Sequence, residues 1–325
     1  MKKIDTVTFI STVLALTATT TIFTITGCTL IFGSLLYPKS IGLYLGLPYY
    51  TYTVLWSRPE FHKGARWMAF ARHFPLFVLL RRYLQMTIDT PLPTELVQAD
   101  DAMDAQLLIA MFPHGTASDY RVALDGMITD VLPNTGPKLR TLVASVLFRL
   151  PIVREFCLFT GCVDARRSVA ERLLDNGHSL LVLPGGEAEQ LQTDYGHDKV
   201  FLKKRLGFIK LAMRKNVPVV PSYVFGVSDY YYTSNALLGL RWWLMKKVAV
   251  CIPLAAGVLG HPLCPRPVPT TVVLGKPLLF AMKEQGNPTA SEVQAGHAEF
   301  IKALVALFDQ HKERLGYGDR ELEVV

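Results

Sequence analysis

A histidine and an aspartate lie five residues apart at the point where a buried strand is expected to end. The apolar run 107–110 predicts that strand. Pro113, His114 and Gly115 then break it, and Asp119 follows about one helical turn later. A loop-borne imidazole with a nearby carboxylate is the minimum for an oriented general base. The alternative is a solvated surface turn, which a short motif does not exclude by itself.

Two clusters of cations stand where helices are expected to start. Arg166 and Arg167 close the loop that begins at Gly161, and Lys203-Lys204-Arg205 comes just before Gly207. Arginine at a helix start is unfavourable for the helix dipole, and a bound anion would offset that cost. Because Arg presents a planar fork of donors suited to phosphate, both clusters predict phosphate contacts. The alternative for the arginine pair is solvated surface charge.

A glycine pair follows a second expected strand, 179–183. Gly185 and Gly186 allow the backbone to approach a ligand closely and to offer N–H donors to a phosphate or an oxyanion. Glu187 and Glu189 come next, and the run 185–189 contains no cation. The alternative for the two glutamates is that they are solvated residues at a helix start.

Strand and helix patterns alternate over residues 106–325. This alternation predicts an α/β catalytic domain with a mainly parallel sheet and flanking helices. The apolar strand 217–224 contains Pro218 and Pro221, which predict an edge or strand-start position because proline cannot donate to a neighbouring strand.

Residues 1–57 are almost free of charge and predict a membrane anchor. The span 6–38 contains no charged residue and exceeds the roughly 20 residues that a membrane helix needs. A second charge-free span, 40–57, is shorter and broken by Pro48. We expect a hairpin that enters and leaves the bilayer on one side. The alternative is one spanning helix followed by an interfacial aromatic segment.

Cations flank this anchor on both sides, which favours two cytosolic ends. They are Lys2 and Lys3 before it, and Arg58, Lys63 and Arg66 after it. Between residues 61 and 86 basic and aromatic side chains alternate with aliphatic ones, as in segments that lie among lipid headgroups. We therefore expect 58–105 to be an interfacial segment with a polar linker at 89–104.

Composition narrows the class of protein. Half of the 325 residues are apolar, and the net charge is +7. No nucleic-acid motif accompanies this charge, so a membrane surface is the expected partner rather than nucleic acid. The five cysteines are odd in number and lack metal-type spacing. We expect a reducing, cytosol-facing compartment, with no disulfide framework and no metal.

Four blocks in order resemble the glycerolipid acyltransferase superfamily: His-x4-Asp, Gly-x5-Arg, a Pro-Gly-Gly loop with glutamates, and an apolar strand with prolines. Within it, the chain resembles the diacylglycerol acyltransferase type 2 family, which also includes monoacylglycerol and wax-ester-forming acyltransferases. The markers are Pro-His-Gly at 113–115, Gly-Gly-x-x-Glu at 185–189 and Arg-x-Gly-Phe at 205–208. Two departures are Phe112, where many members have histidine, and Asp119, which the family often lacks.

The resemblance implies acyl transfer from acyl-CoA to the hydroxyl of diacylglycerol, with His114 as general base. Asp119 would orient the imidazole if it reaches it, and N–H groups near Gly115 or Gly185-Gly186 would bind the oxyanion. No bound cofactor or metal is expected, since acyl-CoA is itself the donor substrate. The expected acyl-CoA contacts, with Lys203 in support, are Arg167, Gly185, Gly186, Glu189, Lys204, Arg205 and Gly207.

The absence of a cation in the 185–189 loop favours a neutral lipid acceptor over a phosphorylated one. Monoacylglycerol or a long-chain alcohol is the alternative acceptor. A hydrolase, for which there is no Gly-x-Ser-x-Gly elbow, and a non-catalytic lipid-binding protein are the competing classes. The resemblance places the chain in the endoplasmic reticulum membrane with its catalytic domain facing the cytosol, or on lipid droplets. Whether it forms a homodimer stays open.

Overall fold

The structure is a computed structural model that describes residues 4–56, 58–248 and 251–325. Lys2 and Lys3, two of the flanking cations, and Ser57, the last residue of the expected anchor, lie outside the described residues.

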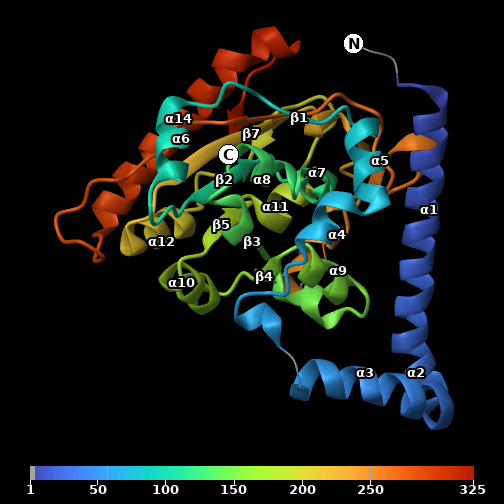
Figure 1. The fold of residues 1–325 in the computed structure, drawn as a ribbon. Helices are drawn as coiled ribbons and strands as arrows, with labels where there is room; N and C mark the ends of the chain where they lie inside the picture. The colour runs from blue at the N-terminus through green and yellow to red at the C-terminus, as the bar shows by residue number, and fades with distance from the viewer. Residues whose placement is uncertain (1–3, 57, 249–250) are drawn as a thin grey trace.

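A mixed seven-stranded sheet forms the centre of the molecule, in the order β1-β10-β7-β2-β5-β3-β4 (Figure 1). The strands β7, β2, β5, β3 and β4 run parallel, whereas β10 is antiparallel to β7 and β1 is parallel to β10. The expected α/β fold with a mainly parallel sheet is confirmed. The strands are β1 Thr87–Ile88, β2 Leu108–Phe112, β3 Leu139–Val143, β4 Cys162–Asp164, β5 Ser179–Val182, β7 Val219–Phe225 and β10 Thr271–Leu274.

Helices cover both faces of this sheet. The first face packs against α10 Arg167–Asp175, α12 Gly207–Lys215 and α14 Ala290–Leu315. The second packs against α5 Pro75–Tyr83, α6 Thr94–Asp101, α7 Asp119–Leu124 and α8 Met127–Val131. Leu108, Ala110 and Phe112 of β2 belong to the first core, and Ile109 and Met111 to the second. Burial on both faces explains the uninterrupted apolar run in the sequence.

Strand β7 lies inside the sheet, between β10 and β2, so the edge position expected as one alternative is wrong. The strand-start alternative holds for Pro218, which directly precedes Val219. On the β10 side the regular pairing stops at Ser222, opposite Leu274, and resumes as a single bridge between Val219 and Leu278. Pro221 falls in this break, where the ladder does not require an N–H donor. An interior strand therefore tolerates the proline.

Two short pairs of strands complete the described β-structure. Parallel β11 Glu323–Val324 and β6 Lys199–Val200 bring the end of the chain to residues 199–203, and antiparallel β8 Tyr232–Thr233 pairs with β9 Ala255–Ala256. The remaining helices used below are α4 Met68–His73, α9 Val153–Phe159, α11 Gly186–Leu191 and α13 Leu238–Val248.

The N-terminal region contains one helix long and apolar enough to cross a membrane among the described residues. It runs over Thr6–Leu36, comprising α1 Thr6–Cys28, η1 Thr29–Gly33 and α2 Ser34–Leu36. The following helical segment, η2 Pro38–Gly46 to α3 Leu47–Thr51, leads away from the lower end of α1 towards the domain (Figure 1). Along α1, Phe9 lies 6.0 Å from Tyr83 and Phe23 lies 5.9 Å from Phe156, measured between ring centroids. One side of the apolar helix therefore packs against the α/β domain.

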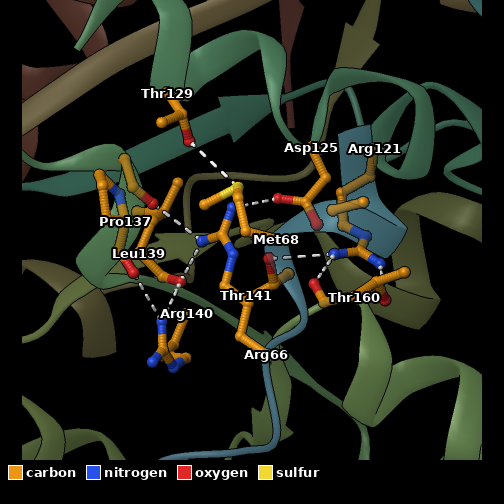
Figure 2. Close-up of polar contacts among 12 residues, drawn as sticks. Arg66, Met68, Arg121, Asp125, Thr129, Pro137, Leu139, Arg140, Thr141 and Thr160 are labelled. Atoms are coloured by element: carbon orange, nitrogen blue, oxygen red, sulfur yellow. Dashed lines mark hydrogen bonds and ion pairs between the residues drawn. The ribbon is translucent and has the colours of Figure 1, made fainter. Parts of the chain in front are cut away.

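Residues 58–105 join this domain more closely than an interfacial linker would. They supply β1 at the sheet edge and the helix α6, in which Leu96 and Asp100 are buried. The Arg66 guanidinium donates to Asp125 at 2.5 Å and to the Leu139 carbonyl at 2.6 Å (Figure 2). Arg66 was expected beside lipid headgroups, but it instead forms a buried ion pair with Asp125.

Candidate active site

His114 stands on the loop that leaves the carboxyl end of β2. The carboxyl ends of the parallel strands β2, β5 and β4 meet at one edge of the sheet, because β5 pairs with β2 and β3 lies between β5 and β4. Gly185 and Arg167 follow two of these ends. The topology therefore gathers three separate sequence motifs on one edge, where ligands bind in open α/β sheets.

Side chains from two helices hold the His114 loop by its backbone. Glu189 of α11 accepts the His114 N–H. Tyr120 of α7 donates to the Pro113 carbonyl at 2.8 Å, and Gln190 donates to the Thr116 carbonyl at 2.6 Å. Each bond fixes a different peptide group, so the loop is organised before any substrate binds.

The imidazole of His114 contacts its own loop. Its Nδ1 lies 3.0 Å from the Gly115 carbonyl and 3.1 Å from the Ser118 hydroxyl, which itself donates to the His114 carbonyl at 2.9 Å. A carbonyl only accepts, so we assign the proton to Nδ1 and the lone pair to Nε2, which lies 3.4 Å from the same Ser118 hydroxyl. Burial lowers the pKa of His114, which keeps the ring neutral and able to accept a proton.

Asp119 faces a tyrosine. Its Oδ2 accepts a hydrogen bond from Tyr231 at 2.8 Å. Burial raises the pKa of Asp119 to about 6, and this hydrogen bond only partly opposes the rise. The contacts of the His114 ring described above come from Ser118 and Gly115. The carboxylate that sequence spacing offered as the orienting group is thus engaged elsewhere.

Glu189 lies under the site and does not face a ligand from solvent. Its side chain is 1% exposed, and its two oxygens accept the His114 and Phe201 N–H groups. Burial raises the pKa of Glu189 to about 7. Gly185 is needed beside it, because a Cβ at this position would fall 2.0 Å from the carboxylate. The sequence predicted that both residues contact acyl-CoA. In the structure, Gly185 makes room for Glu189, and Glu189 supports the loop that carries His114.

The remaining predicted cations are exposed, and one of them, Arg167, lines a cavity next to the segment that carries the others. Arg205 donates to the Gly185 carbonyl at 3.0 Å, and Lys203 and Lys204 are exposed beside it. Two residues after Arg205, Gly207 borders a cavity of about 290 Å³ between α10 and α12. The cavity has an apolar lining and a basic rim. Its lining includes Leu142, Val182, Phe208 and Leu211, and its rim Arg167, Lys210 and Arg214. A ligand with an apolar chain and an anionic head suits this arrangement.

The sequence matches the family described as Diacylglycerol acyltransferase over residues 35–325. The chain belongs to this family. Diacylglycerol O-acyltransferase 2 of Bos taurus is 29% identical over 294 residues, which is 84% of this chain and 77% of the relative. Human acyl-CoA wax alcohol acyltransferase 2 is 29% identical over 315 residues, 88% of this chain and 90% of the relative.

Among solved structures, the 1-acyl-sn-glycerophosphate acyltransferase PlsC of Thermotoga maritima is 14% identical, with a TM-score of 0.45. The match covers 92% of this chain and 97% of PlsC. The family match confirms the resemblance read from the sequence motifs.

Sequence reasoning missed three residues of this diacylglycerol acyltransferase site. Ser118 was available as a hydroxyl four positions after His114, a spacing that returns to the same side of a turn. Tyr120 and Tyr231 had no comparable signal, because their roles depend on the Pro113 carbonyl and on Asp119 as folded. The backbone of Ser118 has φ of +54°, a left-handed conformation that brings its hydroxyl to the ring.

Proposed function

We propose that the protein transfers the acyl group of acyl-CoA to the free hydroxyl of diacylglycerol, forming triacylglycerol. The observation that carries this proposal is His114 itself. It is a neutral imidazole with its Nδ1 turned to acceptors, on a fixed loop at the ligand-binding edge of the sheet. Membership of the diacylglycerol acyltransferase family supplies the reaction class.

In the proposed reaction, His114 Nε2 takes the proton of the acceptor hydroxyl as that oxygen attacks the thioester carbonyl carbon. The new C–O bond forms a tetrahedral intermediate. Its collapse breaks the C–S bond, and the departing CoA sulfur takes the proton from the imidazolium. The products are triacylglycerol and the free CoA thiol, and the imidazole is regenerated.

Ser118 is the proposed positioning residue for the imidazole, in place of Asp119. A hydroxyl that donates to the His114 carbonyl has lone pairs left for the Nδ1 proton, which supports this role. The engagement of Asp119 by Tyr231 argues against the carboxylate. A neutral partner leaves the imidazolium less stabilised than a carboxylate would.

The proposed oxyanion donor is the N–H of Gly115. The Gly185-Gly186 pair is the second place expected from the sequence, and it is partly engaged, because the Gly186 N–H already donates to the Leu183 carbonyl at 3.1 Å. The Gly115 N–H has no acceptor in the described ranges, and a φ of +68° favours glycine there. Donors fixed before the reaction stabilise developing charge without a reorganisation cost.

For the donor substrate, we assign the cavity between α10 and α12 to acyl-CoA. Arg167, Arg205 and Lys204 supply positive charge for its phosphates, and the apolar lining suits its acyl chain. Arg167 forms an ion pair with Glu171 at 2.8 Å with its own side chain largely exposed, so a phosphate can compete for it.

For the acceptor, the absence of a cation among residues 185–189 favours a neutral alcohol over a phosphorylated one. A long-chain alcohol is the second candidate, because the human wax alcohol acyltransferase aligns over 90% of its own length. Monoacylglycerol shares the same neutral hydroxyl chemistry.

The N-terminal region is proposed to hold the enzyme in the endoplasmic reticulum membrane, with the catalytic domain in the cytosol. The apolar helix and the cations Arg58 and Lys63 that follow the anchor support this orientation. A hairpin would require residues 38–56 to enter the bilayer and return. Reaction of single cysteines in this segment with a membrane-impermeant maleimide distinguishes a hairpin from an interfacial segment.

The deciding experiment uses microsomes of a host without neutral-lipid synthesis, expressing wild type or His114→Ala. Labelled oleoyl-CoA is supplied with diacylglycerol, monoacylglycerol or hexadecanol. Label in triacylglycerol that disappears in the variant supports the proposal. Label in wax ester moves the assignment to the alcohol, and label only in free fatty acid makes the protein a hydrolase. Wild-type rates in the variant would remove His114 from the mechanism.

A further inference from the structure

A long stretch of the catalytic domain contains no acidic residue. No Asp or Glu occurs from residue 230 to residue 283, whereas Lys and Arg occur six times, at positions 241, 246, 247, 266, 276 and 283. The surface helix α14 differs, since it carries both acids and bases along its length. A solvated surface normally mixes the two signs, so the acid-free stretch needs a different explanation.

Helix α13 and the loop after it expose large apolar side chains within this stretch. We call this surface the α13 patch; its members are Leu237, Leu240, Trp243, Lys246, Lys247 and Leu259. Leu240, Trp243 and Lys247 recur at the spacing of one helix face. Leu259 is 93% exposed at the tip of the loop. Apolar side chains exposed to this degree mark an interaction surface.

The inner side of α13 already packs against the domain. Its exposed outer side is therefore open to a partner outside this chain. Arg241 is buried and donates to the carbonyls of Ser234, Leu191 and Ile252. These bonds tie the helix to α11 and to the loop that follows it.

The chemistry of the α13 patch fits a bilayer surface. Leucine and tryptophan on one face, with lysines at the end of the helix, are typical of segments lying at the headgroup level. The Lys246 ammonium also lies 5.6 Å from the centre of the ring of Trp242, which neighbours the patch on α13. The stretch itself contributes no acid that would oppose the attraction of the lysines for anionic headgroups, and the acids of the neighbouring segment that contact it are Glu187 and Asp194.

The patch is also continuous with the apolar N-terminal helix. Ala255 and Val258, in the loop after α13, pack in the same core as Phe9 and Val13 of α1. Figure 1 shows this orange segment reaching the upper part of α1. The exposed apolar side of α1 and the α13 patch therefore belong to adjoining parts of the molecule.

We propose that the α13 patch inserts into the headgroup layer of an anionic membrane, as a second membrane contact besides α1. Cys251 contacts the Glu187 carbonyl at 3.6 Å, and α11 carries Glu189 beneath His114. The contact would hold the α11 side of the site against the bilayer that contains the lipid acceptor. The membrane contact stands without the acyl-transfer assignment; only its use as an acceptor entrance rests on the proposed function.

The test places an environment-sensitive fluorophore at Leu259→Cys in the full-length chain, reconstituted in phosphatidylcholine vesicles with or without phosphatidylserine. Cys28 and Cys251 are replaced by serine, and the buried cysteines remain. Met103→Cys is the matched control, because Met103 is 94% exposed and follows α6, on the side of the molecule away from α1 (Figure 1). Nitroxide-labelled lipid and aqueous iodide serve as quenchers.

We expect a blue-shifted probe at 259 that nitroxide lipid quenches and iodide does not, and the opposite behaviour at 103. Lys246→Glu with Lys247→Glu should abolish the additional lipid quenching that phosphatidylserine produces. Equal, water-like behaviour at 259 and 103 would overturn the proposal. A probe shielded from both quenchers would also overturn it, and would indicate a protein partner such as a second copy of the chain. Probe readings do not depend on turnover, so an inactive enzyme leaves this result interpretable.

Discussion

The two ends of helix α7 carry carboxylates in opposite situations. At its start, Asp119 meets the phenol of Tyr231, and burial raises its pKa to about 6. Just past its end, Asp125 forms an ion pair with Arg66, with Arg121 and its threonine partners nearby (Figure 2). The paired carboxylate holds a segment that follows the apolar N-terminal region, whereas Asp119, five positions after the proposed base, accepts from Tyr231. Proximity in sequence to a histidine thus does not decide what a carboxylate does.

The comparison predicts that changes at the His114 loop, before α7, lower activity, whereas changes just after α7 lower stability. The variant His114→Ala should show the largest difference between the two effects. Loss of the general base should lower kcat by about 10³-fold, while the melting temperature stays unchanged because the loop is held by its backbone. Oleoyl transfer and thermal unfolding in detergent measure the two effects. His178→Ala is the matched control, since His178 lies at the opposite edge of the same sheet, just before β5. A comparable loss in that variant would show that the effect is not specific to the site.

At the other end of the helix, Asp125→Ala should act on folding. The change leaves Arg66 buried without its partner, which costs about 3–5 kcal/mol of unfolding free energy. Asp130→Ala, which breaks the exposed Arg72–Asp130 pair, is the control and should cost less than about 1 kcal/mol. Denaturant unfolding in detergent measures both, and kcat per folded molecule should remain that of wild type. Equal effects of the two changes would contradict the distinction drawn between the pairs.

The pH dependence of stability tests a third buried carboxylate, Glu189, which like Asp119 lacks a cationic partner in the contacts described above. Its folded-state pKa is raised from 4.5 to about 7, so the folded protein holds this proton more tightly than the unfolded chain. The contribution is therefore present at pH 4.5 and is lost as pH rises through 7, by up to about 3 kcal/mol. Asp119 acts in the same direction, so the informative quantity is the difference between wild type and Glu189→Gln. Melting temperatures from pH 5 to 8 should fall more steeply in wild type; parallel curves would argue against a protonated Glu189.

A smaller effect is expected for Ser118→Ala. Removing one hydrogen bond to the imidazole should lower kcat by about tenfold, with KM unchanged. Ser118→Gly is the companion variant, because glycine lacks the hydroxyl but accepts a φ of +54° without strain. The same loss in both variants assigns the effect to the hydroxyl. Recovery in the glycine variant would assign it to the backbone.

The smallest effect should come from Asp119→Asn. An amide oxygen can still accept the Tyr231 hydroxyl, so kcat should stay within about twofold of wild type. If Asp119 oriented the base in the working enzyme, the same change would cost orders of magnitude, as it does in carboxylate–histidine pairs. Steady-state rates of the purified variant decide between these outcomes.

Local patterns were enough to predict the strands β2, β5 and β7 and the loop that carries His114. They did not predict β1 or β3, and β4 lies in the stretch after Gly161 that was expected to be a loop. The strand β2 is apolar on both faces because both faces are covered, and that run is readable without a structure. The residues that contact the His114 loop could not be predicted from the sequence. Asp119 and Tyr231 are separated by 112 positions, and only the folded chain decides which of the two neighbours, Ser118 or Asp119, turns to the imidazole.

The positions of charged side chains were the hardest feature to predict from the sequence. Hydropathy identified an apolar span, yet Arg66 turned inward to Asp125, and Glu189 turned under the loop where a ligand contact was expected. Each depends on a counter-charge or a donor from a distant element, which no local spacing reports. Pro221 led to the prediction of an edge strand for a similar reason. The break in pairing that accommodates this proline depends on β10 and the residues after it, which are distant in sequence.

The small sheet at the carboxyl terminus has a practical consequence for anyone who purifies this enzyme. The Val325 carbonyl accepts the N–H groups of Leu202 and Lys203, and β11 pairs with β6. Residues 323–325 are therefore held by backbone hydrogen bonds beside Lys203 and close in sequence to Arg205. An affinity tag joined to this segment without a spacer would strain those bonds, so turnover should be higher in a preparation that carries a spacer.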